Sequence, residues 1–328
     1  MNLKNLPKIE LHLHLEGAAP PAFIQALARE KNRDLSGILD GNGDYAYRNF
    51  SDFLKVYEAA CTVLQSPEDF RRLTRTVLAE SAGQGVIYTE IFLSPDFCGG
   101  SDLGAWREYL NAIREAAREA ERQDGIVMRG IVTCIRHLGP ERAKRAARCA
   151  AETVDDFVVG FGMGGDEHHG RQGDFAWAFD MCREAGLRLT THAGEWGGAQ
   201  SVREALDDLR VDRIGHGIQT IDDPALVDRI AENGTVLEIC PGSNVALGAC
   251  SGWPDHPIAR LRGHGVKVSI STDDPPYFKT TMCREYDRLA ETFGWQDEDF
   301  LDIARNSADA AFCDAATRKL LLEKLEAA

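Results

Sequence analysis

The sequence has no pair of cysteines at CxxC spacing, although it contains nine cysteines in all. An odd, dispersed set is typical of reduced thiols in a cytosolic protein and argues against a disulfide framework. It also argues against a zinc site built from clustered thiolates. The nine are Cys61, Cys98, Cys134, Cys149, Cys182, Cys240, Cys250, Cys283 and Cys313.

Long apolar runs and an excess of positive charge are absent as well. No stretch approaches the ~20 apolar residues that a membrane helix needs, and residues 1–10 have no apolar signal core. The chain has 37 basic and 52 acidic residues, for a net charge of −15. Such a surface repels polyanions, so nucleic acid and anionic membranes are poor partners. We expect a cytoplasmic protein with a small-molecule ligand, and the oligomeric state stays open.

What the sequence does contain is a regular alternation of β-rich runs and longer helical patterns across its 328 residues. Several helical patterns stop at a glycine just before a strand, as at Gly85 and Gly186, where a left-handed residue ends a helix. Eight strand–helix units favour an α/β fold of the (β/α)8 TIM-barrel type over an open sheet. The predicted strands are Ile9–His14, Val86–Leu93, Ile126–Thr133, Phe157–Gly162, Leu187–His192, Arg213–His216, Thr235–Ile239 and Val266–Ser271.

The predicted helices include two in succession, residues 52–65 and 67–84, which form a helical insertion after the first strand. A helical tail over residues 297–324 follows the last strand. No linker, repeat or low-complexity run divides the chain, so residues 1–328 are expected to form a single domain. The other predicted helices are Pro20–Glu30, Leu103–Glu121, Glu141–Ala151, Phe175–Ala185, Ser201–Leu209, Pro224–Glu232, Pro257–Arg262 and Glu285–Thr292.

Polar residues follow several of the predicted strands, at the end where a barrel of this type forms its active site. The first strand ends in His12 and His14, which alternation points to the same side. The fifth strand ends in His192, with Glu195 close behind, and the sixth ends in His216. Each of these alone is more often a structural residue than a ligand, but together they converge on one rim.

The eighth strand adds Asp273 and Asp274 to the same rim. An aspartate pair before proline is usually a turn or a helix cap. Next to four histidines, however, it completes the set of imidazole and carboxylate ligands that zinc prefers. Three histidines and one aspartate would hold the ion, which lowers the pKa of a bound water toward ~7. The remaining groups suit general acid–base catalysis.

Seven segments, taken in order, resemble the adenosine/adenine deaminase family of the amidohydrolase superfamily. The combination of HxH, HAGE, GHG and TDDP is specific, although no single motif is. The segments are Glu10–Gly17 (ELHLHLEG), Gly85–Pro95 (GVIYTEIFLSP), Gly162–Glu167 (GMGGDE), His192–Glu195 (HAGE), Arg213–Gly217 (RIGHG), Glu238–Asn244 (EICPGSN) and Ser271–Pro275 (STDDP). The resemblance implies a zinc-dependent hydrolase that removes the amino group of an adenine-type ring.

The resemblance also implies residue roles. Glu195 resembles the acid that protonates the ring nitrogen beside the attacked carbon, His216 the histidine that orients the attacking water, and Asp274 the carboxylate that hydrogen-bonds to that water. Because only a neutral acid can donate, Glu195 needs burial or acidic neighbours that raise its pKa. The implied ligands of one zinc ion per chain are His12, His14, His192 and Asp273, and the implied substrate side is His14, Glu16 and Gly165.

The substrate motifs point in two directions. Glu16 stands where adenosine deaminases usually carry Asp, and Glu there is familiar from the adenine-acting branch. Residues 164–167 (GGDE) instead look like the nucleoside branch, and Gly242 is small enough to leave room for a bulkier substituent. We therefore expect adenosine and 2′-deoxyadenosine, giving inosine and 2′-deoxyinosine plus ammonia. The alternatives are adenine and a modified adenine nucleoside.

Three rival interpretations are less well supported. Other amidohydrolase reactions often use two metals bridged by a carboxylated lysine on the fourth strand, but residues 157–162 contain no lysine. A catalytically inactive purine-binding barrel would be expected to lose Glu195, Asp274 or a ligand, and none is lost. Deaminases that act on polynucleotides carry a CxxC signature, which is absent here.

Some residues keep two interpretations. Glu90 either orients a metal-binding histidine or has a structural partner. Arg136 and His137 resemble a family dipeptide whose role is open, and the alternative is that they form a salt bridge at the rim. Four side chains at helical spacing in the insertion either cap a substrate or pack as an ordinary helix face. These are Phe50, Phe53, Leu54 and Tyr57.

Overall fold

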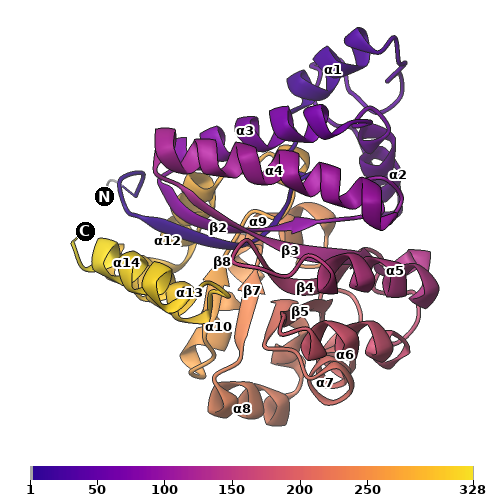
Figure 1. The fold of residues 1–328 in the computed structure, drawn as a ribbon. Helices are drawn as coiled ribbons and strands as arrows, with labels where there is room; N and C mark the ends of the chain where they lie inside the picture. The colour runs from indigo at the N-terminus through magenta and orange to yellow at the C-terminus, as the bar shows by residue number, and fades with distance from the viewer. Residues whose placement is uncertain (1–2, 328) are drawn as a thin grey trace.

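The computed structural model describes residues 3–327, in which eight parallel strands each pair with the next along the chain (Figure 1). Every boundary lies within two residues of the predicted one, so all eight predicted strands are confirmed. The strands are β1 (Lys8–His14), β2 (Val86–Leu93), β3 (Val127–Ile135), β4 (Val158–Gly164), β5 (Arg188–Ala193), β6 (Arg213–His216), β7 (Val236–Ile239) and β8 (Val268–Ile270).

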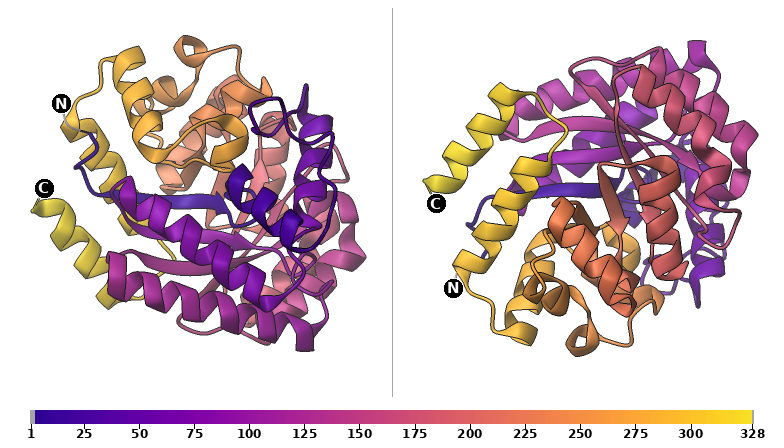
Figure 2. Two further views of the ribbon diagram at one scale, coloured as in Figure 1. Left: turned by 90° about the horizontal axis from the view of Figure 1, so that it is seen from above. Right: turned by 90° about the horizontal axis from the view of Figure 1, so that it is seen from below.

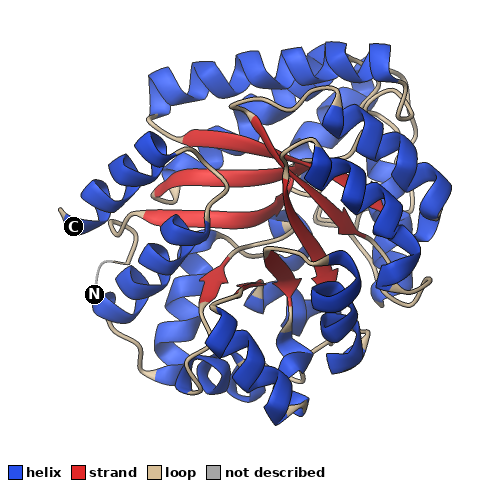
Figure 3. Cartoon of the chain, turned by 60° about the horizontal axis from the view of Figure 1, so that its bottom comes forward, coloured by secondary structure: helices blue, strands red, loops and turns tan. Residues whose placement is uncertain are grey.

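The first and last strands meet just beyond the end of β8. The His14 amide donates to the Asp273 carbonyl and the Asp273 amide to the His12 carbonyl, both at 3.1 Å. Helices surround the strands, which lie in the interior of the molecule (Figure 3). Covered on both faces, the strands are almost wholly buried, as parallel strands require. The predicted (β/α)8 barrel is confirmed.

The predicted two-helix insertion is α2 (Phe50–Cys61) and α3 (Pro67–Gly83), which follow α1 (Pro21–Glu30) between β1 and β2 (Figure 2). The long helices α3 and α4 lie side by side. The helices are α1 (Pro21–Glu30), α2 (Phe50–Cys61), α3 (Pro67–Gly83), α4 (Leu103–Asp124), α5 (Pro140–Ala151), α6 (Ala176–Glu184), α7 (Gly198–Glu204), α8 (Pro224–Asn233), α9 (Pro241–Leu247), α10 (Ile258–Gly263), α11 (Pro275–Phe278), α12 (Met282–Phe293), α13 (Asp297–Ala310) and α14 (Ala315–Glu326).

Two short helices were not predicted from the sequence. Helices α9 and α11 follow β7 and β8 directly, and each begins at a proline. They span only seven and four residues, which is too short for a helical repeat of apolar positions to show. The predicted tail is in fact two helices, because Asp314 accepts hydrogen bonds from the Ala316 and Thr317 amides and starts α14 afresh.

The C-terminal helices pack against the barrel and contribute to the hydrophobic core. The Phe300 side chain on α13 is fully buried and stacks on Tyr286 of α12, with ring centroids 4.5 Å apart. Helix α13 also packs against β1 and β8, so it closes the barrel wall near the start of the chain. Across residues 3–327, no helix is both long and apolar enough to cross a membrane.

Replacing Phe300 with alanine tests this packing. Phe300→Ala should lower the free energy of unfolding by about 3–5 kcal/mol, because it leaves a cavity under a stacked ring. Chemical denaturation followed by circular dichroism measures the change. The control is Leu320→Ala on α14, where the side chain is 45% exposed and the change should stay within about 0.5 kcal/mol. Equal changes in both variants would show that α13 does not contribute to the core.

Candidate active site

A cavity opens at the carboxyl ends of the strands. Strand ends supply one side of its lining, and helix α2 of the insertion supplies another. The strand-end residues include His14, Phe92, Gly164, His192, His216 and Asp273, and those from α2 are Phe50, Phe53, Leu54, Tyr57 and Glu58. All four side chains considered as a substrate cap therefore face the cavity.

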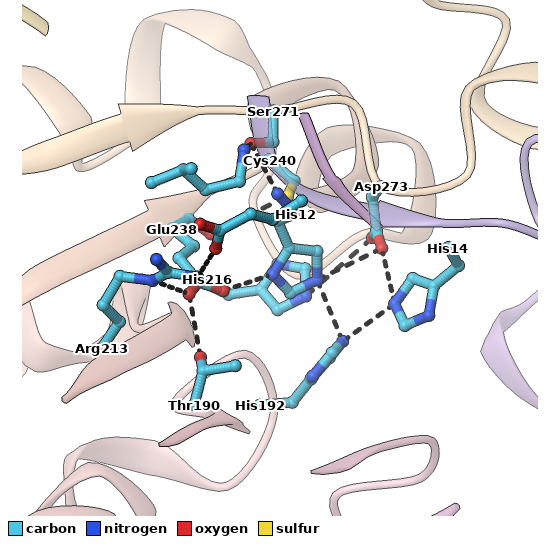
Figure 4. A network of polar contacts seen from close by, with 12 residues as sticks. His12, His14, Thr190, His192, Arg213, His216, Glu238, Cys240, Ser271 and Asp273 are labelled. Carbon is cyan, nitrogen blue, oxygen red and sulfur yellow. Dashed lines mark hydrogen bonds and ion pairs between the residues drawn. The ribbon is translucent and has the colours of Figure 1, made fainter. Parts of the chain in front are cut away.

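Four of the predicted side chains converge at the floor of this cavity (Figure 4). The Nε2 atom of His192 lies 3.1 Å from Nε2 of His12 and 3.3 Å from Nε2 of His14. Oδ1 of Asp273 lies 3.3 Å from Nε2 of His14 and 3.5 Å from Nε2 of His12. With metal–ligand bonds of about 2.0–2.1 Å, the ligands of a tetrahedral zinc ion lie roughly 3.3 Å apart. The spacing therefore fits one divalent ion.

The second nitrogen of two of these rings is held by a hydrogen-bond acceptor. Nδ1 of His12 lies 2.9 Å from Oε2 of Glu238, and Nδ1 of His192 lies 2.8 Å from the Met163 carbonyl oxygen. Nδ1 must carry the proton in both rings, which leaves the Nε2 lone pair free for a metal. Burial also holds the pKa of His192 well below its usual value, which favours the neutral ring that a metal requires.

Glu238 is the centre of a buried network beneath the predicted metal ligands. Besides His12, its carboxylate accepts from Nε of Arg213 at 2.6 Å and from Oγ1 of Thr190 at 2.9 Å. Burial alone would raise the pKa of Glu238, but the adjacent Arg213 and His12 lower it to about 2. The carboxylate is therefore ionised, and it both orients His12 and increases its basicity as a ligand.

Of the two interpretations of Glu90, the one that gives it a structural partner is confirmed, and the one that pairs it with a metal-binding histidine is wrong. Its carboxylate accepts from Nη2 of Arg213 at 2.5 Å, from the Tyr88 hydroxyl at 2.7 Å and from the Phe312 amide at 2.5 Å. The partner of His12 is Glu238 and not Glu90. Glu90 instead contacts Arg213, which in turn pairs with Glu238. Glu238 was missed because it lies inside a strand rather than at the strand end.

The three residues expected to do acid–base chemistry line the cavity beside the predicted metal ligands. His216 Nε2 lies 3.7 Å from Oε2 of Glu195 and 3.9 Å from Oδ2 of Asp273. Burial and the neighbouring carboxylates raise the pKa of Glu195 and of Asp274 well above the usual range. Within residues 3–327, His216 Nε2, Glu195 Oε1 and Asp274 Oδ1 are buried without a hydrogen-bond partner. Unpaired polar atoms of this kind are typical of a site that binds a ligand.

Glu167 fixes the backbone that carries Glu195. One oxygen of its carboxylate accepts from the Gly194 amide at 2.7 Å, and the other accepts from the amides of Glu195, Trp196 and Gly197 at 2.7–3.0 Å. A carboxylate that receives four amide hydrogens holds the loop rigidly. The GGDE motif contains this glutamate, but the resemblance gave a role only to its glycine.

Of the residues considered for substrate binding, Glu16 and Gly165 line the cavity, whereas Gly242 does not. Glu16 lines the cavity, burial raises its pKa to about 8, and within residues 3–327 its Oε1 has no hydrogen-bond partner. Gly165 also lines the cavity, with φ +98°, and a Cβ there would lie 2.8 Å from Nδ1 of His137. The expectation that Gly242 leaves room for substrate is wrong. Its free space is filled by the Glu285 carboxylate, to which the Gly242 amide donates at 2.9 Å.

The dipeptide Arg136-His137 holds the rim of the cavity. The Arg136 guanidinium donates to the His169 and Gly170 carbonyls at 2.7 and 2.8 Å, so its partners are backbone atoms rather than a carboxylate. His137 bridges α2 and the loop after β4. Its Nε2 lies 3.1 Å from Oε1 of Glu58, and its Nδ1 accepts from the Asp166 amide at 3.3 Å.

Relatives of the chain match it from end to end. A family model described as adenosine deaminase matches residues 7–328. An adenine deaminase of Rhizobium leguminosarum bv. trifolii (strain WSM2304) is 47% identical over 321 residues, which are 98% of this chain and 99% of that protein. An adenine deaminase of Chelativorans sp. (strain BNC1) is 44% identical and covers 98% of each protein.

The similarity to solved structures also covers nearly the whole chain. The crystal structure of adenine deaminase from Arthrobacter aurescens has a TM-score of 0.91 to this chain at 29% identity, covering 98% of both chains. An amidohydrolase from Burkholderia ambifaria, solved with bound zinc, has a TM-score of 0.86 at 28% identity. It covers 99% of this chain and 94% of the other.

The support that Glu238 gives to His12 can be measured without any substrate. Glu238→Gln should weaken Zn²⁺ binding about 10–100-fold, because a neutral amide orients His12 less firmly and increases its basicity less. Competition with a chromogenic chelator measures the affinity. The control is Glu285→Gln, which changes another buried carboxyl group in the same way but touches none of the histidines. Equal losses in both variants would show that the effect belongs to the barrel interior as a whole.

Proposed function

The chain belongs to the adenosine deaminase family, and from that premise we propose that its substrate is adenine, which it hydrolyses to the 6-oxopurine and ammonia. The enzyme is a hydrolase that acts on a carbon–nitrogen bond of a cyclic amidine, and it removes the amino group of an adenine-ring substrate. Of the substrates considered from the sequence, the relatives support the alternative, adenine, better than adenosine.

The observation that carries the choice of adenine is the Glu16 carboxyl group in the cavity. Within the described chain its Oε1 is buried without a partner, which is costly unless a ligand satisfies it. Free adenine has a ring N–H on its imidazole side that a carboxyl oxygen can accept. In adenosine that nitrogen carries the sugar instead. The longer side chain of Glu, where adenosine deaminases usually have Asp, brings the carboxyl group closer to the ring.

The charge of the cavity separates adenine from nucleotides. Five acidic residues line the cavity, and no lysine or arginine is among its lining residues. A phosphate group placed there would have no lysine or arginine side chain to pair with. The acidic residues are Glu16, Glu58, Glu195, Asp273 and Asp274. The cavity therefore suits a neutral base or nucleoside better than its phosphate ester.

We propose zinc as the metal, held by the three histidines and Asp273. Imidazole and carboxylate donors at these spacings suit zinc, and the Burkholderia relative was solved with it. An ion held there supplies hydroxide at neutral pH by lowering the pKa of water.

The chain's own residues then carry the proton and the orientation of the ring. Glu195, kept protonated by burial and by neighbouring carboxylates, gives its proton to the ring nitrogen beside the amino-bearing carbon. That proton draws electron density from the carbon that water attacks. His216 and Asp274 orient the water, and the Gly165 amide and Glu16 hold the ring. The attacked carbon gains oxygen, and the amino group leaves as ammonia.

Ammonia release from a panel of substrates tests the proposed function. The zinc-loaded protein should show its highest kcat/KM with adenine, a lower value with adenosine and 2′-deoxyadenosine, and the lowest with AMP. Glu195→Gln should retain zinc but lose about 10²–10⁴-fold in kcat, because it cannot donate the proton. Faster turnover of adenosine or of a modified adenosine would move the substrate to a nucleoside. No ammonia from any compound would point to another amidohydrolase reaction.

Shortening Glu16 tests the recognition of the free base. In Glu16→Asp the carboxyl group no longer reaches the imidazole N–H, so kcat/KM for adenine should fall about 10–100-fold. Adenosine should lose less, and the ratio of the two kcat/KM values is the measurement. The control is Glu58→Asp, which shortens another cavity carboxylate that already pairs with His137. Parallel losses for both substrates in Glu16→Asp would contradict the assignment.

A further inference from the structure

A chain of hydrogen bonds behind the cavity determines which nitrogen of His216 carries its proton. It begins at the Ile258 amide, which donates to Nδ1 of His256 at 3.2 Å. A backbone N–H is a donor that cannot reverse, so Nδ1 is unprotonated and the proton of the neutral ring lies on Nε2. Burial lowers the pKa of His256 to about 3, so the ring is neutral. Its Nε2 faces Oδ1 of Asn244 at 3.3 Å.

The next link reaches His216. With Oδ1 occupied by His256, the Asn244 amide group presents its NH2 to Nδ1 of His216, 3.2 Å away. Asn244 is fully buried, so water cannot replace either partner. Nδ1 of His216 accepts this hydrogen bond, and the proton of the neutral ring is on Nε2. That N–H points to the cavity, between Glu195 and Asp273.

His216 thus carries its proton on the other ring nitrogen from the neighbouring histidines, which are proposed to bind the metal. Nδ1 of His12 faces a carboxylate and Nδ1 of His192 faces a carbonyl, so these rings present a lone pair at Nε2. His216 faces an amide donor and presents a hydrogen at Nε2. The ring centroids of His216 and His12 are only 4.8 Å apart, so distance alone does not separate their roles. The hydrogen-bond partner at Nδ1 does.

We propose that Asn244 and His256 are positioning residues that hold His216 as the Nε2–H tautomer, so that His216 donates a hydrogen bond to the attacking oxygen and serves neither as a metal ligand nor as a general base. The role of His216 in the reaction rests on the proposed function, whereas its tautomer does not. A neutral ring with its hydrogen on Nε2 has no lone pair there. It stabilises the negative charge that develops on the oxygen, as a preorganised donor does.

The tautomer can be read directly in the metal-free protein without substrate. In protein labelled with ¹⁵N-histidine, two-bond ¹H–¹⁵N correlations distinguish protonated from unprotonated ring nitrogens, and His216→Gln assigns the signal. The expected result is His216 with its proton on Nε2. A proton on Nδ1 would overturn the proposal. Because no turnover is involved, this outcome is independent of whether adenine is the substrate.

Variants of the two positioning residues give the second test. Asn244→Asp places an acceptor at Nδ1, which should move the His216 proton to Nδ1 and lower kcat about 10²–10³-fold, with less effect on KM. His256→Leu frees the Asn244 amide to rotate and should give a smaller loss, which His256→Gln should largely restore because its amide still donates to Asn244. The substrate is whichever compound of the panel the enzyme turns over.

The control for these variants is His264→Leu. His264 is an exposed histidine that directly follows α10, whereas His256 lies just before that helix. It should change neither kcat nor the His216 signal. Thermal melting identifies any variant that does not fold. The proposal fails if folded Asn244→Asp retains full kcat or leaves the His216 proton on Nε2. It also fails if His256→Gln loses as much kcat as His256→Leu.

Discussion

The buried ion pair between Arg213 and Glu238 is the interaction on which the site depends. It keeps Glu238 ionised in the barrel interior, and the carboxylate accepts from Nδ1 of His12, which turns Nε2 of that ring toward the proposed metal position. A buried carboxylate without a cation would instead take up a proton. Arg213 is shared with Glu90, so one guanidinium pairs with two buried carboxylates.

The same guanidinium connects the site to the C-terminal helices. It lies 3.5 Å above the centre of the Phe312 ring and donates to the Ala310 carbonyl at 2.8 Å. The Phe312 amide in turn donates to Glu90. The segment that joins α13 and α14 therefore helps to place His12, a proposed metal ligand near the other end of the sequence. For this reason the C-terminal helices are functional parts of the barrel and not an appendage.

The sequence predicts the barrel and the residues at its rim because both follow from local patterns. Alternation and terminal glycines define the strands, and strand ends collect at one edge in any parallel barrel. The choice between Glu90 and Glu238 as the partner of His12 depends on the stagger between strands that are distant in sequence. No local pattern records that stagger. The space beside Gly242 is likewise taken by Glu285, which comes from a helix 43 residues later.

Several residues of the recognised motifs act on other residues and not on a substrate. Glu167 binds four backbone amides of the Glu195 loop, and Glu238 orients His12. Neither residue is among those that line the cavity, yet each determines what an adjacent group can do. A histidine at a strand end is a ligand or a hydrogen-bond donor according to its partner at Nδ1. The chemistry of this rim is therefore determined by the residues that hydrogen-bond to the rim histidines from behind. Predicting it from sequence requires the partner of each ring as well as the ring itself.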